Sequence, residues 1–262
     1  MMIFADAEAG YEESLFVIFG VPFEDKEMSF RSGTAEAPDF IRYAGWNYES
    51  YDMKTDIDLQ DIAIHDAGNV TLEKAPELVR KIRNDGKTPI GMGGAHSVTP
   101  SLVASLDEEF GVVVLDAHMD FRDEYLGDAE SHACTSRRIF DRVGKERIVS
   151  VGVRSASRNE VKDAGELGFT YYHGNRLAEP LEIPFENIYL SVDMDVFDPS
   201  LAPGVSNPEP NGAGYEILEL IGSMAKRIIA MDVVEVCPSY DDGRTALLAA
   251  KLIRDFICRK VA

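Results

Sequence analysis

The sequence alternates, over its whole length, between short apolar runs and longer amphipathic stretches. Most of the runs are five to nine residues long, rich in valine and isoleucine, and typical of strands buried on both faces of a parallel sheet. The runs are LFVIFGV (15–21), DIAIHDA (61–67), TPIGMGG (88–94), FGVVVLDAH (110–118), RIVSVGV (147–153), FTYYH (169–173), NIYLSVDMDVF (187–197) and RIIAMDVVEV (227–236). The clearest amphipathic stretches, at 71–87, 214–227 and 242–260, have apolar residues at helical spacing. This alternation predicts an α/β fold: one three-layer αβα sandwich, residues 1–262, around a mostly parallel sheet of about eight strands.

The chain is strongly acidic. Its 262 residues include 46 aspartates and glutamates against 26 lysines and arginines, which gives a net charge of −20. Such a surface repels nucleic acid and anionic membranes and attracts metal ions or an amine substrate, although solubility alone would also explain the excess. We therefore expect a small cationic substrate, and neither a nucleic-acid nor a membrane partner.

The N-terminal segment and the cysteines both favour a cytoplasmic protein. The segment MMIFADAEAGYEES lacks the basic region and apolar run of a secretory signal, and LFVIFGV is too short to cross a bilayer. The three cysteines, Cys134, Cys237 and Cys258, are too few and too scattered for a disulfide framework or a thiolate metal site. We expect Cys134 and Cys237 to be small buried side chains rather than nucleophiles.

Polar residues gather where four of the predicted strands end. Ligands of open parallel sheets bind at the carboxyl ends of the strands. Residues at i, i+2 and i+4 of a strand share one face, so we expect the polar side chains of each strand end to converge. The polar residues at these ends are His96; Asp116, His118 and Asp120; Asp193 and Asp195; and Glu235.

Six of these residues together predict a metal centre. Any one of them alone is more often a helix cap, a turn residue or a satisfied polar group. Four carboxylates in one low-dielectric cleft, however, would repel each other strongly unless cations lay between them. A site rich in carboxylate, with some imidazole and no thiolate, suits Mn(II) better than Co, Fe, Ni or a structural zinc. A pair of such ions activates water, which predicts hydrolysis at carbon or phosphorus; the ligands would be His96, Asp116, His118, Asp120, Asp193 and Asp195.

Four motifs in order resemble those of the arginase/agmatinase (ureohydrolase) family. They are GGAHS (93–97), DAHMD (116–120), SVDMDVFDPSLAPG (191–204) and VEVCP (234–238). The resemblance covers nearly the whole chain. It implies an arginase-like αβα domain, two Mn(II) ions per chain, a homo-oligomer that is trimeric or hexameric, and hydrolysis of a guanidinium compound to urea and an amine.

The resemblance also implies roles for individual residues. The same six side chains would be the metal ligands, and Asp120 would in addition hold the attacking hydroxide and help pass its proton to the departing amine. Glu235 would accept hydrogen bonds from the substrate guanidinium, whose planar donors match a carboxylate. His132, in SHACTSRR, corresponds to the proton-shuttling histidine of the family.

One position departs from the family pattern. Ala95 stands in GGAHS where the family usually has an acid beside the first metal-binding histidine. That acid is not a ligand, so the site remains, but lost outer support commonly costs about 10- to 100-fold in metal affinity or activity.

The loop 121–131, FRDEYLGDAES, bears on the choice of substrate. It offers the acids Asp123, Glu124, Asp128 and Glu130 against a single base, Arg122. Acids repel a carboxylate tail and attract an ammonium tail, so we expect Asp123 and Glu124 to help bind a cationic substrate. With the likeness of VCPSYD (236–241) to agmatinases, this favours agmatine, with putrescine and urea as products.

Other interpretations stay open at this point. The acids could form only a solvated loop, and the substrate could be aminopropylagmatine, guanidinobutyrate or arginine. The chain could also be a non-catalytic family member that binds a cationic ligand or regulates a partner; Ala95 is the feature that points that way.

Overall fold

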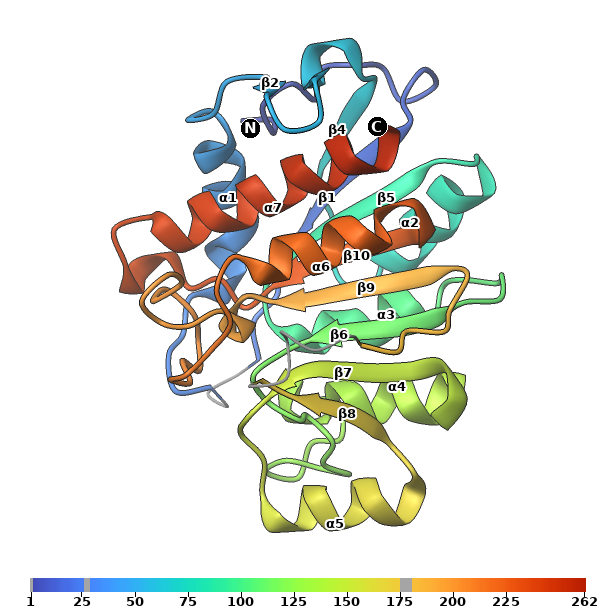
Figure 1. Ribbon diagram of the computed structural model, residues 1–262, viewed down its shortest axis with the longest axis vertical. Helices are drawn as coiled ribbons and strands as arrows, with labels where there is room; N and C mark the ends of the chain where they lie inside the picture. The colour runs from blue at the N-terminus through green and yellow to red at the C-terminus, as the bar shows by residue number, and fades with distance from the viewer. Residues whose placement is uncertain (1, 26–28, 175–180) are drawn as a thin grey trace.

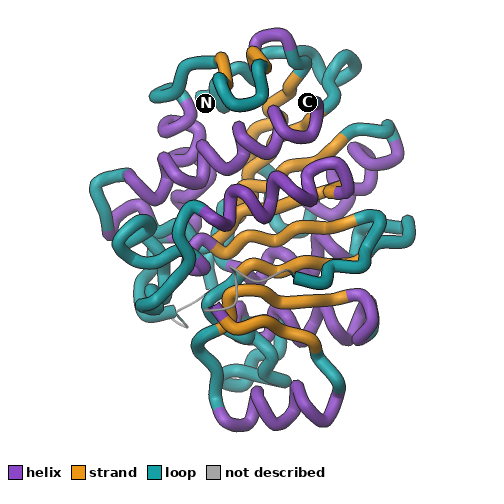
Figure 2. Tube along the Cα trace, viewed as in Figure 1, coloured by secondary structure: helices purple, strands orange, loops and turns teal. Residues whose placement is uncertain are grey.

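A single parallel sheet forms the centre of the molecule, with helices on both faces (Figures 1 and 2). The computed structural model describes residues 2–25, 29–174 and 181–262 of the chain. In these ranges the sheet has eight strands, in the order β4-β1-β5-β10-β9-β6-β7-β8, and every neighbouring pair is parallel. The strands are β1 Phe16–Val21, β4 Ile64–Asn69, β5 Thr88–Gly93, β6 Gly111–Leu115, β7 Ile148–Val153, β8 Thr170–His173, β9 Ile188–Asp193 and β10 Ile228–Val234. Each predicted run contains or overlaps one of them, so the predicted fold class and strand number are confirmed.

Six of the strands are buried along their full length, because side chains on both faces of each strand pack into a hydrophobic cluster. On β6, Val113 and Leu115 join one hydrophobic cluster, while Val112 and Val114 join the other. The two edge strands differ: β4 alternates between buried and half-buried residues, and β8 has no buried residue. The continuous apolar pattern therefore describes the interior strands and fails at the edges, where one side meets solvent.

Two helical layers cover the sheet. The first hydrophobic cluster packs α1 (Ala37–Gly45), α6 (Glu216–Met224) and α7 (Arg244–Val261) on one face. The second packs α2 (Ala75–Asn84), α3 (Thr99–Val103), α4 (Thr135–Val143) and α5 (Arg158–Leu167) on the other. The helices predicted at 71–87, 214–227 and 242–260 are α2, α6 and α7. Two short strands, β2 (Tyr51–Asp52) and β3 (Ile57–Asp58), form a separate antiparallel pair.

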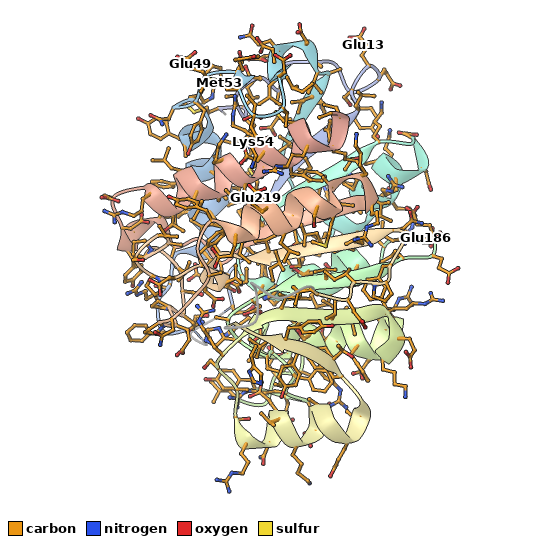
Figure 3. All side chains as sticks on the ribbon, in the orientation of Figure 1. Glu13, Glu49, Met53, Lys54, Glu186 and Glu219 are labelled. Carbon is orange, nitrogen blue, oxygen red and sulfur yellow. The ribbon has the colours of Figure 1, made fainter. Side chains whose placement is uncertain are left out.

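The excess acid lies on the outside. Figure 3 shows Glu13, Glu49, Glu186 and Glu219 at the surface, and all four are exposed. Glu219 pairs with Lys54 across the front of the molecule. Within the described ranges, no helix combines the length and the apolar character that crossing a bilayer requires.

The four strands at the centre, β5, β10, β9 and β6, place the predicted site. Because all of them are parallel, their carboxyl ends meet at one edge of the sheet. The motifs GGAHS, VEVCP, SVDMD and DAHMD leave the sheet from these four adjacent ends. Segments that are far apart in the sequence therefore deliver their polar residues to one place.

Candidate metal centre and active site

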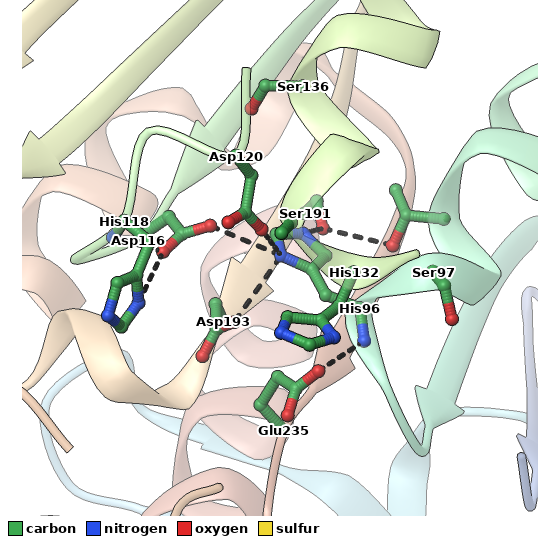
Figure 4. Close-up of polar contacts among 12 residues, drawn as sticks. His96, Ser97, Asp116, His118, Asp120, His132, Ser136, Ser191, Asp193 and Glu235 are labelled. Carbon is green, nitrogen blue, oxygen red and sulfur yellow. Dashed lines mark hydrogen bonds and ion pairs between the residues drawn. The ribbon is translucent and has the colours of Figure 1, made fainter. Parts of the chain in front are cut away.

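The six predicted ligands lie together at this edge of the sheet. Figure 4 labels five of them: His96, Asp116, His118, Asp120 and Asp193. His96, Asp116 and Asp193 form one group whose ligand atoms lie within 4.8 Å of one another. Asp116, His118 and Asp195 form a second such group, which shares Asp116 with the first. Two adjoining positions for a cation result, with one carboxylate common to both.

In the first group, three carboxylates surround one imidazole nitrogen. His96 Nδ1 lies 3.2 Å from Asp116 Oδ2, 3.3 Å from Asp193 Oδ2 and 3.4 Å from Asp120 Oδ2. Asp120, the sixth predicted ligand, therefore reaches this group as well.

In the second group, a single imidazole meets two carboxylates. His118 Nδ1 lies 2.8 Å from Asp195 Oδ2 and 3.8 Å from Asp116 Oδ1. The two oxygens of Asp116 thus face different groups, which is the geometry of a bridging carboxylate.

Buried polar atoms without partners indicate that these residues fit cations. Among the described residues, His96 Nδ1 and Asp116 Oδ2 are fully buried and have no hydrogen-bond partner. A buried polar group left in that state costs about 1–3 kcal/mol, which a coordinated ion would offset. Burial, together with the carboxylates of Asp120 and Asp195, also raises the pKa of Asp116 to about 7. Divalent ions held by oxygen and imidazole ligands remove both penalties.

The reason predicted for this convergence is wrong, although the residues do converge. β6 ends at Leu115, before Asp116, and Asp195 lies in a 3-10 turn, Met194–Val196, after β9. Strand alternation therefore does not align these side chains. Instead, local hydrogen bonds turn the backbone: Asp116 accepts from the His118 amide at 2.6 Å, and Asp193 from the Asp195 amide at 2.8 Å.

Two site residues hold an unfavourable backbone conformation. Asp120 has φ 49° and Glu235 has φ 66°, both in the left-handed region that non-glycine residues rarely adopt. Such conformations concentrate at functional sites, where the surrounding structure enforces them. Glu235 turns the chain directly after β10, and Asp120 turns it in the loop that follows β6.

A buried polar network holds His96 from behind. His96 Nε2 lies 3.1 Å from Ser191 Oγ, and the Ser191 hydroxyl donates to Asp232 Oδ1 at 2.6 Å. The Tyr189 hydroxyl donates to the other oxygen of Asp232 at 2.5 Å. This network was not predicted from the sequence, although Asp232, an acid inside the apolar run RIIAMDVV, could have indicated it. Ala95 is buried and directly precedes the 3-10 turn His96–Val98. Its side chain is a methyl group, so it gives His96 no polar contact.

Glu235 lies buried beside the ligand groups. One of its oxygens accepts from the His96 amide at 2.5 Å, and the other meets the Ser206 hydroxyl. Burial raises the pKa of Glu235, which the nearby charge of His132 partly opposes. Figure 4 shows the His132 ring beside this carboxylate.

His132 opens the 3-10 turn His132–Cys134, capped by the Ser131 side chain. Its Nδ1 lies 2.9 Å from Asp25 Oδ2, and its backbone amide donates to the same oxygen at 2.7 Å. Burial alone would lower the pKa of His132, but the hydrogen bond to Asp25 and the charges of Glu235 and Asp120 raise it to about 8. Asp25 was not among the predicted site residues, because it belongs to none of the four motifs.

A cavity of about 330 Å³ opens above the ligand groups. His118, Asp120, His132, Asp193, Asp195 and Glu235 form its floor and wall, and Arg122, Tyr125, Ser155, Ser157, Glu160 and Asn207 also line it. The metal groups therefore face a space large enough for a small molecule.

The two loop acids proposed as substrate contacts lie elsewhere. Asp123 is exposed and pairs with Arg138 at 3.0 Å, and neither Asp123 nor Glu124 is among the described residues that line the cavity. Their neighbours Arg122 and Tyr125 line it instead, with Arg122 3.4 Å from Glu160. The structure does not bring Asp123 and Glu124 to the ligand groups, and their role in substrate binding stays a prediction.

The cysteines are buried, and their chemistry does not suit a nucleophile. Burial raises the thiol pKa of Cys134 to about 11 and that of Cys237 to about 12. Both thiols therefore stay protonated near neutral pH.

Comparison with known proteins agrees with the geometry. A family model described as the arginase family matches residues 14–258. The agmatinase of Halalkalibacterium halodurans is 33% identical over 97% of this chain and 95% of its own length. The N(1)-aminopropylagmatine ureohydrolase of Thermococcus kodakarensis is 34% identical over 92% of this chain and 89% of its own. Among solved structures, the agmatine ureohydrolase of Thermoplasma volcanium has a TM-score of 0.95 and 37% identity, and covers 100% of this chain and 94% of its own. The chain therefore belongs to the arginase family and is a metal-dependent hydrolase that acts on guanidino groups.

Proposed function

We propose that the protein is a binuclear-manganese agmatinase, which hydrolyses agmatine to putrescine and urea. One observation carries the proposal: two imidazole–carboxylate groups share Asp116 beneath a cavity whose wall contains Glu235 and His132. Relatives named agmatinase align over nearly the whole chain, which supports the same reaction.

The donor set favours manganese. Four carboxylates, two imidazoles and no thiolate suit Mn(II), and two ligand groups suit two ions per chain. When bound, such ions supply an activated water at neutral pH and stabilise the charge that develops on the reacting carbon's substituents.

The residues around the metal groups bind and orient the substrate. Glu235 presents a carboxylate at the cavity wall, where it accepts hydrogen bonds from the planar guanidinium and aims the central carbon at the floor. Asp120 holds the attacking water by a hydrogen bond, accepts its proton and passes this proton on to the departing amine. The ring of His132 faces the same space and transfers a proton to the amine that leaves.

A cationic tail fits this cavity better than an anionic one. Glu160 and Glu235 line the space besides the metal ligands, and Arg122, the one arginine among the described lining residues, is paired with Glu160. Agmatine carries one amine besides its guanidinium, and aminopropylagmatine extends the chain with a second amine. The latter is the second candidate, because a relative that covers most of this chain has that name.

Urea release from a substrate panel tests the proposal. Protein loaded with Mn(II) is incubated with agmatine, N(1)-aminopropylagmatine, guanidinobutyrate and arginine, and metal per chain is measured on the same sample. We expect two manganese ions per chain and the highest kcat/KM with agmatine. A higher value with aminopropylagmatine would transfer the assignment to that substrate. Two bound ions and no urea from any compound would overturn it in favour of a non-catalytic role.

The assembly and partners are also proposals. We propose a trimeric or hexameric homo-oligomer in the cytoplasm that binds a small cationic guanidinium substrate. Light scattering coupled to gel filtration measures the first point, and a mass of one chain would contradict it.

A further inference from the structure

Asp25 is the hydrogen-bonding partner of the His132 ring. It is not among the cavity-lining residues, whereas His132 is. Its carboxylate accepts three hydrogen bonds: from the backbone amide of His132 at 2.7 Å, from His132 Nδ1 at 2.9 Å, and from the Ser97 hydroxyl at 2.5 Å. The side chains of Asp25 and His132 are only 7% and 12% exposed, so water competes little for these bonds.

We propose that Asp25 is a positioning residue that fixes the orientation and the tautomer of His132. The inference rests on the proposed function, in which His132 moves a proton between the enzyme and the substrate. A carboxylate can only accept, so the nitrogen that faces it, Nδ1, keeps its hydrogen. The other nitrogen, Nε2, is left to face the cavity, and any proton that His132 exchanges with the substrate moves through Nε2.

The backbone around Asp25 is built to hold this position. Gly94 of GGAHS lies so close to the segment after β1 that a Cβ on it would fall 1.8 Å from the Phe23 carbonyl oxygen. The amide of Ala95 donates to the same carbonyl at 2.9 Å. Only glycine permits this approach, and it brings the chain leaving β1 against the loop that carries the ligand His96.

Ser97 links Asp25 to the metal loop. It follows His96 directly, and its hydroxyl occupies the carboxylate oxygen that His132 does not use. One carboxylate thus joins three loops: the segment after β1, the turn after β5 and the turn that begins at His132. The His132 ring also packs against the ring of Tyr125 in a T-shaped arrangement, with ring centroids 6.0 Å apart. The ring is therefore held from two directions.

Kinetics of matched variants test the proposal. We expect Asp25→Asn to lower kcat by about 10- to 100-fold, as for other partners that orient a functional histidine, with KM and metal content little changed. In the His132→Asn background, the same Asp25→Asn change should alter kcat by less than about twofold, because interacting residues are not additive. Asp128→Asn is the control: it removes an exposed carboxylate four residues from His132 and should keep wild-type kinetics in both backgrounds.

The outcome that overturns the inference is a clear one. An equal loss of kcat in both backgrounds would mean that Asp25 acts on the fold and not through His132. If the Asp25 variants fail to fold, Ser97→Ala decides, since it removes one bond to Asp25 and leaves the carboxylate in place. It should give a smaller loss of kcat, and this loss should vanish in the His132→Asn background.

A crystal structure of Asp25→Ala separates this inference from the proposed function. If the wild-type protein releases urea from no guanidinium compound, the proposed function fails, but the ring position can still be observed. We expect the His132 ring to turn about its Cα–Cβ bond in Asp25→Ala and to keep its position in Asp128→Asn. A ring that stays in place without Asp25 would overturn the inference independently of any activity.

Discussion

Asp116 is the residue on which both ligand groups depend. Its Oδ2 faces His96 and its Oδ1 faces His118, and the side chain is fully buried. His96 and Asp193 belong to one group only, and His118 and Asp195 to the other. Substitutions of Asp116 and of His118 should therefore remove different numbers of metal ions.

We expect Asp116→Asn to lose both metal ions and His118→Asn to lose one. The amide is neutral and has a single acceptor oxygen, so it cannot serve two cations, whereas His118 contributes only to the group with Asp195. Urea release should fall by at least about 100-fold in Asp116→Asn. Metal per chain after dialysis against Mn(II) is the measurement, with circular dichroism to verify the fold. Two ions retained by Asp116→Asn would contradict the bridging role.

At the scale of the elements, β9 and β10 support the metal loop that follows β5. Ser191 of β9 connects His96 to Asp232 of β10 through two hydrogen bonds. His96 therefore has polar support from Ser191 and Asp232, although GGAHS has Ala95 in place of the acid that the family usually has there.

Two buried serines on neighbouring parts of the sheet test this support. Ser191→Ala should raise the Kd for Mn(II) by about 10- to 100-fold, because His96 loses the partner of its Nε2. Ser150→Ala on β7 is the matched control: Ser150 is equally buried, but it contacts Ser136 and not a ligand. Titration of the metal-free proteins with Mn(II) measures both. Equal Kd values for the two variants would show that the network does not act on the metal.

The strands could be predicted from the sequence because a strand that is buried on both faces has apolar residues at consecutive positions. All eight strands of the large sheet overlap predicted runs, whereas α1, α3, α4, α5 and the short pair β2–β3 were not specified. The loops after the strands could not be derived in the same way. The left-handed turns at Asp120 and Glu235 leave no mark in residue spacing, and strand alternation gave a wrong reason for the convergence.

The candidate site was predictable where a motif carried it. The six ligands, Glu235 and His132 all lie in motifs or beside them, and the structure brings them together. Asp25 pairs with His132 across 107 positions, and no local pattern signals such a contact. Asp123 and Glu124 were chosen from charge alone, which does not say where a loop directs its side chains.

At the scale of the whole molecule, the site makes stability depend on metal and pH together. The pKa values of Asp116 (about 7), His132 (about 8) and His118 (about 11) are all raised in the folded chain. The folded chain therefore keeps protons that the unfolded chain has already released, and without metal its stability falls as the pH rises through these values. Bound metal replaces the protons of the ligands Asp116 and His118 and removes their part of the loss.

We therefore expect Mn(II) to raise Tm more at high pH than at low pH. The difference in Tm between Mn(II)-loaded and chelated protein should grow by roughly 5 °C or more between about pH 6 and about pH 9. Thermal unfolding at both pH values measures it, with Asp116→Asn as the control in which the difference should disappear. A difference that shrinks with rising pH would contradict the electrostatic account.

The strand order has a consequence for how the chain is made. β10, the last of the eight strands in chain order, pairs with β5 on one side and β9 on the other. Until it arrives, the nascent chain can build only two half-sheets, β4-β1-β5 and β9-β6-β7-β8, each with a bare apolar edge. Such edges are prone to pair with other chains, so a product truncated before residue 228 should aggregate rather than persist as a smaller enzyme. Insertion of one late strand thus joins the halves and assembles the catalytic centre in a single event.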